Sequence, residues 1–78
     1  MKQSEIETII YQNTSVDHYR GSVRGISETA EILHKKTNLD EDEIYTILNH
    51  ELDGDRYSGN VRGIDDAAKK IIKLIEKK

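Results

Sequence analysis

Asp17-His18-Tyr19-Arg20-Gly21-Ser22-Val23-Arg24-Gly25-Ile26 is the stretch that decides the fold, because the chain repeats it as Asp55-Arg56-Tyr57-Ser58-Gly59-Asn60-Val61-Arg62-Gly63-Ile64. Seven of these ten positions are identical at a constant offset of 38 residues. The shared pattern is D-x-Y-x-G-x-V-R-G-I, and helical apolar spacing flanks it both times. A loop that recurs at a fixed spacing indicates that the chain consists of two equivalent units.

Four segments have the apolar periodicity of an amphipathic helix, one on either side of each loop. We expect them over about residues 4–13, 27–36, 40–52 and 65–76. Polar residues that can accept a hydrogen bond from the first helical turn are expected to cap them, namely Ser4, Ser27, Asp40 and Asp65. Asn38 follows the second helix, and asparagine tolerates the left-handed conformation that often ends a helix.

The two halves of the chain, about residues 1–38 and 39–76, therefore read as tandem helix–loop–helix repeats. One such unit cannot bury its apolar face alone, so we expect the two to pack about a pseudo-twofold axis. The predicted fold is all-α, with four short helices in a single domain that spans residues 1–78. Because each loop is long for a helical hairpin, we expect Val23 and Val61 to pair as a short bridge between the loops.

Composition limits the class of protein and its partners. The 78 residues include no Cys, Trp, Phe or Pro, so the predicted core is thin, and a protein partner or a homo-oligomer would help to cover it. The formal net charge of −3 weighs against nucleic acid as the main partner. No apolar run is long enough to span a bilayer, so we expect no membrane association and a cytoplasmic location.

The repeated loops supply the candidate ligand-binding residues. An arginine, a glycine and the start of a helix together favour an anion, because the guanidinium and the free amide groups all donate hydrogen bonds. A tyrosine five residues earlier could stack on a flat ligand. The candidate residues are Tyr19, Arg24, Gly25, Tyr57, Arg62 and Gly63. The alternative is structural: the arginines pair with Asp17 and Asp55, each with that of its own repeat or of the other, the glycines shape the turns and the tyrosines belong to the core.

Neither catalysis nor a cofactor is expected. The three histidines are isolated, and no nucleophile has an evident base and orienting partner. The helix–loop–helix pairs resemble paired EF-hands in shape, but the calcium-ligand positions hold residues that cannot chelate the ion. These residues are Val16, His18 and Arg20 in the first loop, and Gly54, Arg56 and Ser58 in the second. No metal site is predicted.

Three functions remain open. The first is a small non-catalytic regulator or inhibitor that binds a partner protein, with the acidic run Asp40–Glu43 as one possible contact. The second is an anion- or nucleotide-binding module that uses the repeated loops. The third is binding of nucleic-acid phosphates through the loops and the lysines of the last helix. For the third, Gly25-Ile26-Ser27-Glu28-Thr29-Ala30-Glu31-Ile32-Leu33 resembles the second part of a helix–hairpin–helix motif, although Val23-Arg24 stands where that family has an apolar residue and proline.

Overall fold

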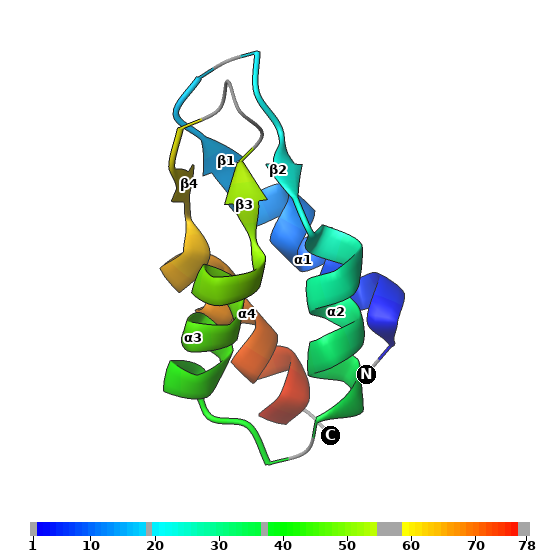
Figure 1. Ribbon diagram of the computed structural model, residues 1–78. Coiled ribbons are helices and arrows are strands. Elements are labelled where there is room, and N and C mark those ends of the chain that lie inside the picture. The colour runs from blue at the N-terminus through cyan, green and yellow to red at the C-terminus, as the bar shows by residue number, and fades with distance from the viewer. Residues whose placement is uncertain (1, 19, 37, 55–58, 77–78) are drawn as a thin grey trace.

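The structure is a computed structural model that describes residues 2–18, 20–36, 38–54 and 59–76 (Figure 1). Four helices make up most of it, which confirms the all-α prediction. They are α1 (Gln3–Asn13), α2 (Ile26–Lys35), α3 (Glu41–Glu51) and α4 (Ile64–Glu76). The helices α1 and α2 pack together, as do α3 and α4, and α1 also contacts α4. None of the described helices has the length and apolarity needed to cross a membrane.

Four two-residue strands gather at one end of the molecule, and they pair between the repeats (Figure 1). Strand β1 (Ser15–Val16) pairs antiparallel with β4 (Val61–Arg62). Strand β2 (Val23–Arg24) pairs in the same way with β3 (Asp53–Gly54). Each repeat therefore contributes one strand to each pair.

The predicted bridge between Val23 and Val61 is wrong. Val23 lies opposite Gly54, and Val61 lies opposite Val16. The reason is the backbone after α1 and α3. Thr14 and Leu52 leave these helices in extended conformation, with φ/ψ of −112°/150° and −80°/138°. The chain is thus already extended where the loop of the other repeat passes. Each loop valine therefore pairs with this extended segment, and not with the valine of the other loop.

The elements of the two halves correspond at the offset of 38 residues. Helix α1 maps onto α3 over its whole length, and the start of α2 maps onto the start of α4. The strand register corresponds as well: Ser15 opposite Arg62 maps onto Asp53 opposite Arg24. Related segments therefore make related contacts, as two tandem repeats should. The pseudo-twofold axis itself stays a prediction.

The core lies between the four helices and is aliphatic, as the composition requires. The predicted apolar stripes supply most of it: Ile6, Ile10, Ala30, Leu33, Ile44, Leu48, Leu52, Ala68 and Ile71 are buried. Leu39, Ile64 and Ala67 are buried too. Thr29 is fully buried, and its hydroxyl donates a hydrogen bond to the carbonyl oxygen of Gly25 at 2.6 Å. This bond satisfies a polar group that would otherwise cost free energy in the core.

Of the four predicted caps, one is confirmed. The Asp40 carboxylate accepts a hydrogen bond from the Glu43 amide at 2.8 Å, and the Asp40 amide donates one to the Glu43 carboxylate at 3.3 Å. Asn38 also adopts the left-handed conformation expected of it, with φ of 57°. Helix α1, in contrast, starts one residue before Ser4, with Lys2 as its cap.

Ser27 and Asp65 are not caps, because α2 and α4 each begin one residue earlier, directly after a glycine. Gly25 and Gly63 have φ of 85° and 86°, and this left-handed conformation turns the chain into the helix. Each glycine also lies against the end of a helix of the other repeat. A Cβ atom on Gly25 would lie 2.6 Å from the Glu51 carbonyl oxygen, and one on Gly63 would lie 1.9 Å from that of Asn13.

Replacing these glycines should destabilise the fold. We expect Gly25→Ala and Gly63→Ala each to cost at least roughly 1–3 kcal/mol, the usual cost of a strained left-handed residue. Gly63→Ala should cost more, because its Cβ would approach a backbone oxygen more closely. Thermal unfolding followed by circular dichroism measures both effects. The matched control is Lys69→Ala on the exposed face of α4, for which a change within about 0.5 kcal/mol is expected. Alanine variants as stable as the wild type would contradict the close packing.

Candidate functional site

Arg62, one of the predicted ligand-binding residues, forms an ion pair between the repeats. Its Nε donates a hydrogen bond to Oδ1 of Asp17, which follows β1 directly. The Asn60 amide donates to Oδ2 of the same carboxylate at 3.2 Å, and the Asp17 amide donates to the Asn60 carbonyl at 3.2 Å. The Arg62 side chain is nevertheless 73% exposed. Arg62 thus forms an ion pair with an aspartate, as in the structural alternative to ligand binding. The pair lies at the surface and extends the contact between β1 and β4.

This pair shifts the pKa of both partners in the direction that favours their charged forms. The hydrogen bond from Arg62, and then the one from the Asn60 amide, lower the pKa of Asp17. The same bond and the negative charge of Asp17 raise the pKa of Arg62. Both groups are exposed, so water and salt screen the interaction and limit its contribution to stability.

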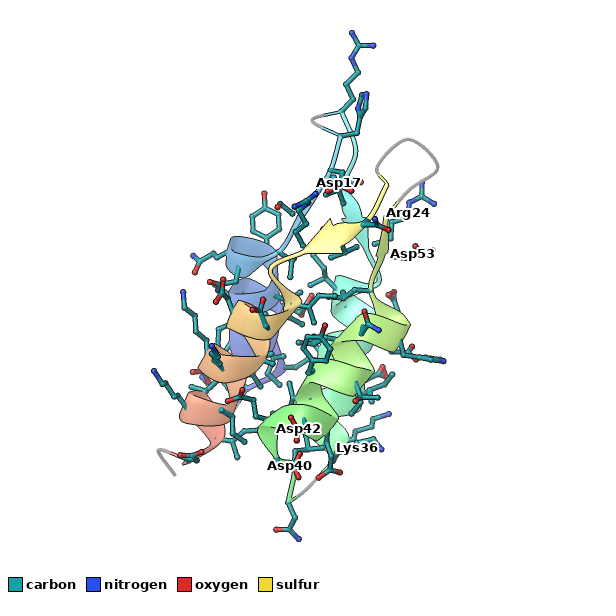
Figure 2. The ribbon with its side chains drawn as sticks, turned by 90° about the vertical axis from the view of Figure 1, so that its left-hand side faces the viewer. Asp17, Arg24, Lys36, Asp40, Asp42 and Asp53 are labelled. Carbon is teal, nitrogen blue, oxygen red and sulfur yellow. The ribbon has the colours of Figure 1, made fainter. Side chains whose placement is uncertain are left out.

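Arg24 occupies the equivalent position in β2, but its surroundings differ. It is exposed and lies opposite Asp53 in the strand register, at the same end of the molecule as Asp17 (Figure 2). Among the residues that the structure describes, none forms a hydrogen bond or an ion pair with the Arg24 guanidinium. The predicted partner Asp55 and the candidate residues Tyr19 and Tyr57 lie outside the described residues. Arg24 and Arg62 stand in different strand pairs.

A backbone carbonyl oxygen of the other repeat lies beside each of the helix starts that follow these arginines. The carbonyl oxygen of Glu51, the last residue of α3, lies against Gly25, and that of Asn13, the last residue of α1, lies against Gly63. The C-terminal end of a helix carries partial negative charge, so its carbonyl disfavours an anion in the adjacent space. Anion binding at Arg24, Gly25, Arg62 and Gly63 stays a prediction.

Two hollows lie between the strand pairs, one in each repeat. The first hollow has a volume of about 490 Å³ and lies between β1 and β2; the described residues that line it are Tyr11, Thr14, Ser15, Val16, His18, Gly21, Ser22, Val23 and Ile26. The second hollow has a volume of about 350 Å³ and lies between β3 and β4; it is lined by Asn49, Leu52, Asp53, Gly59, Asn60, Val61 and Ile64. Every residue of the second list is the counterpart, 38 positions on, of a residue in the first.

The hollows share a backbone frame but differ in chemistry. Tyr11 of the first corresponds to Asn49 of the second, and Ser15 corresponds to Asp53. Tyr11 is 75% exposed, which is unusual for an aromatic side chain in a chain with so few of them. Ile26 in the first hollow is half-buried, whereas its counterpart Ile64 is buried in the core. The first hollow therefore presents more apolar surface to solvent.

Sequence reasoning missed this site, although a signal was present. The residues that are identical in the two repeats point to the loop arginines and glycines. The informative position is one at which the repeats differ. Near the end of the first helix, the first repeat has Tyr11 where the second has Asn49. The hollow could not be found from the loops alone, because it depends on which strands pair.

Comparison of the chain with protein-family models, with curated proteins and with solved structures gives no match. The function is therefore inferred from the side chains that line the two hollows.

The ion pair predicts a specific pH dependence. A carboxylate whose pKa is lower in the folded state stabilises the fold above its unfolded pKa, about 3.9, and this contribution is lost as the pH falls through the folded pKa. In Arg62→Gln, the pKa of Asp17 should move back toward its ordinary value, and less stability should be lost on acidification. Titration of the Asp17 carboxyl by NMR measures the shift. Arg24→Gln is the matched control and should leave the Asp17 titration unchanged; equal titration curves in both variants would contradict the pair.

Titration with inorganic phosphate tests the predicted anion site. If the repeated loops bind an anion, millimolar phosphate shifts the amide resonances of Gly25, Ile26, Gly63 and Ile64, and Arg24→Gln weakens the effect in the first repeat. Unchanged resonances at these four amides would remove anion binding as a function of the loops. Chloride at equal ionic strength is the control for general screening.

Proposed function

We propose that the protein is a small non-catalytic interaction protein, a regulator or inhibitor, that binds a partner protein through the first hollow. The observation that carries this proposal is Tyr11, a tyrosine 75% exposed at the edge of a concave surface. Half-buried Val16, Val23 and Ile26 line the same hollow. An exposed aromatic residue beside aliphatic side chains is typical of the central contact in a protein interface.

The size of the first hollow suits an anchoring side chain of a partner rather than a flat contact. Its volume of about 490 Å³ lies in the range of surface pockets that hold organic groups. Tyr11 offers a large apolar ring together with a hydroxyl that can keep a hydrogen bond at the rim. Thr14 and Ser15 supply further polar groups, so both apolar and polar side chains line the hollow.

The second hollow serves as an internal comparison. Its rim has Asn49 and Asp53 in place of Tyr11 and Ser15, and Ile64 contributes little surface because it is buried. The two hollows have a common frame, so a difference in binding between them would follow from these side chains. We expect a partner protein to occupy the first hollow in preference to the second.

Peptide selection with a matched pair of tyrosine variants tests this function. Random short peptides displayed on phage are selected on the immobilised protein, and the enriched peptides are synthesised. We expect Tyr11→Ala to weaken their binding about tenfold or more, as for the truncation of an interface anchor. Isothermal titration calorimetry measures the affinities.

The control is Tyr45→Ala, because Tyr45 is 44% exposed on α3 and lines neither hollow. Its effect on binding should stay below about twofold, as expected of a residue outside the contact. Thermal unfolding must show that both variants fold like the wild type. Peptides that bind Tyr11→Ala as tightly as the wild type would contradict the proposal, as would a selection that enriches no binder over the bare support.

A further inference from the structure

Within the described part of the chain, strand β1 has an open edge on the side of the first hollow. It pairs there with β4 alone, while β2, across the first hollow, pairs with β3. The two strands of the first repeat are joined by the loop between them, yet they do not pair with each other. An unpaired strand edge is a template for another extended chain.

The hydrogen bonds of β1 show which of its backbone groups are available. Val16 lies opposite Val61, and the next residue, Asp17, donates its amide to Asn60 at 3.2 Å. Bonded and non-bonded pairs alternate along an antiparallel ladder, so the amide and carbonyl of Val16 point away from β4. Among the described residues, no backbone bond outside the strand ladders reaches Val16. Val16 lines the first hollow, where a bound segment could complete these bonds.

A second feature indicates the charge of such a segment. A side hollow of about 400 Å³ adjoins the first hollow through Tyr11 and Ile26, and Glu7, Thr8 and Ser27 complete its lining. Glu7 is half-buried there, and its carboxylate has no hydrogen bond or ion pair with any residue in the described part of the chain. A carboxylate without a partner favours a cation beside it.

We propose that the first hollow binds an extended segment of a partner protein that pairs with the edge of β1, seats an apolar side chain against Tyr11 and places a basic side chain at Glu7. This inference rests on the proposed function and names the chemistry of the partner. Main-chain hydrogen bonds to Val16 would set the register, and the first hollow and the side hollow would select alternate side chains, as in other cases of strand addition. The net charge of −3 favours association with a basic segment.

Two matched peptide libraries test the charge preference. Peptides of both libraries alternate apolar and polar residues; one carries arginine at the polar positions and the other carries aspartate. On the wild type, the arginine library should enrich and the aspartate library should not. Glu7→Gln should weaken binding of the enriched arginine peptides about tenfold, in the range of a lost charged hydrogen bond. Glu41→Gln removes the same charge at the start of α3 and should change the affinity less than about twofold.

Hydrogen exchange tests strand addition independently of charge. When an enriched arginine peptide is bound, the Val16 amide should exchange at least about tenfold more slowly than in the unbound protein. A peptide methylated at its strand-pairing amide nitrogens should lose binding, whereas methylation of the alternate nitrogens should not.

The outcomes separate the two proposals. Peptides that depend on Tyr11 but show no preference for arginine, or leave Val16 exchange unchanged, would overturn the extended basic segment and keep the proposed function. Binding that depends on Glu7 and not on Tyr11 would overturn the apolar anchor and, with it, both proposals. Salt up to molar concentration should weaken the arginine peptides and spare uncharged peptides that depend on Tyr11.

Discussion

The structure depends on the close approach of two glycines to the helix ends of the opposite repeat. Gly25 lies against the last carbonyl of α3, and Gly63 lies against the last carbonyl of α1. Both have a left-handed backbone, which starts α2 and α4 at the same points in the two repeats. Because a Cβ atom would meet a backbone oxygen at both places, no other residue fits without a shift of the helices. These contacts join the repeats where β1 and β3 begin and where β2 and β4 end.

Strand exchange between the repeats follows from this constraint. With each loop held against the other repeat, β1 pairs with β4 and β2 pairs with β3. The two strands of one repeat are then neighbours without being paired, and a hollow remains between them. The duplicated fold thus produces two duplicated hollows. Their side chains differ, with a tyrosine in one and an asparagine in the other, so one frame offers two surfaces of different polarity.

The repeat and the helices could be predicted from the sequence because they depend on local patterns. Apolar spacing predicted the four helices, and Ile6, Ile10, Ile44 and Leu48 on their inner faces are fully buried. The capping pattern identified Asp40 correctly. Such signals act within one or two helical turns, where the chain itself determines the geometry.

The strand partners and the site could not be predicted, because they depend on contacts between residues far apart in the chain. Val61 could have paired with either valine, and only the extended backbone after α1 favours Val16. The sequence allowed Arg62 to pair with the aspartate of either repeat, and the pairing of β4 with β1 brings it to Asp17. Ser27 and Asp65 failed as caps because a left-handed glycine, which periodicity does not detect, starts each helix one residue earlier.

The central claim is that each loop pairs with the segment that follows the first helix of the opposite repeat, and not with the other loop. The most direct test is the set of proton–proton contacts seen by NMR. In an antiparallel ladder, residues at non-bonded positions have their Cα atoms only about 4.5 Å apart, so their Hα protons give a strong cross-relaxation signal. We predict such a signal between Val16 and Val61, and none between Val23 and Val61. A strong signal between the Hα protons of Val23 and Val61 would show that the loops pair with each other and would contradict the account.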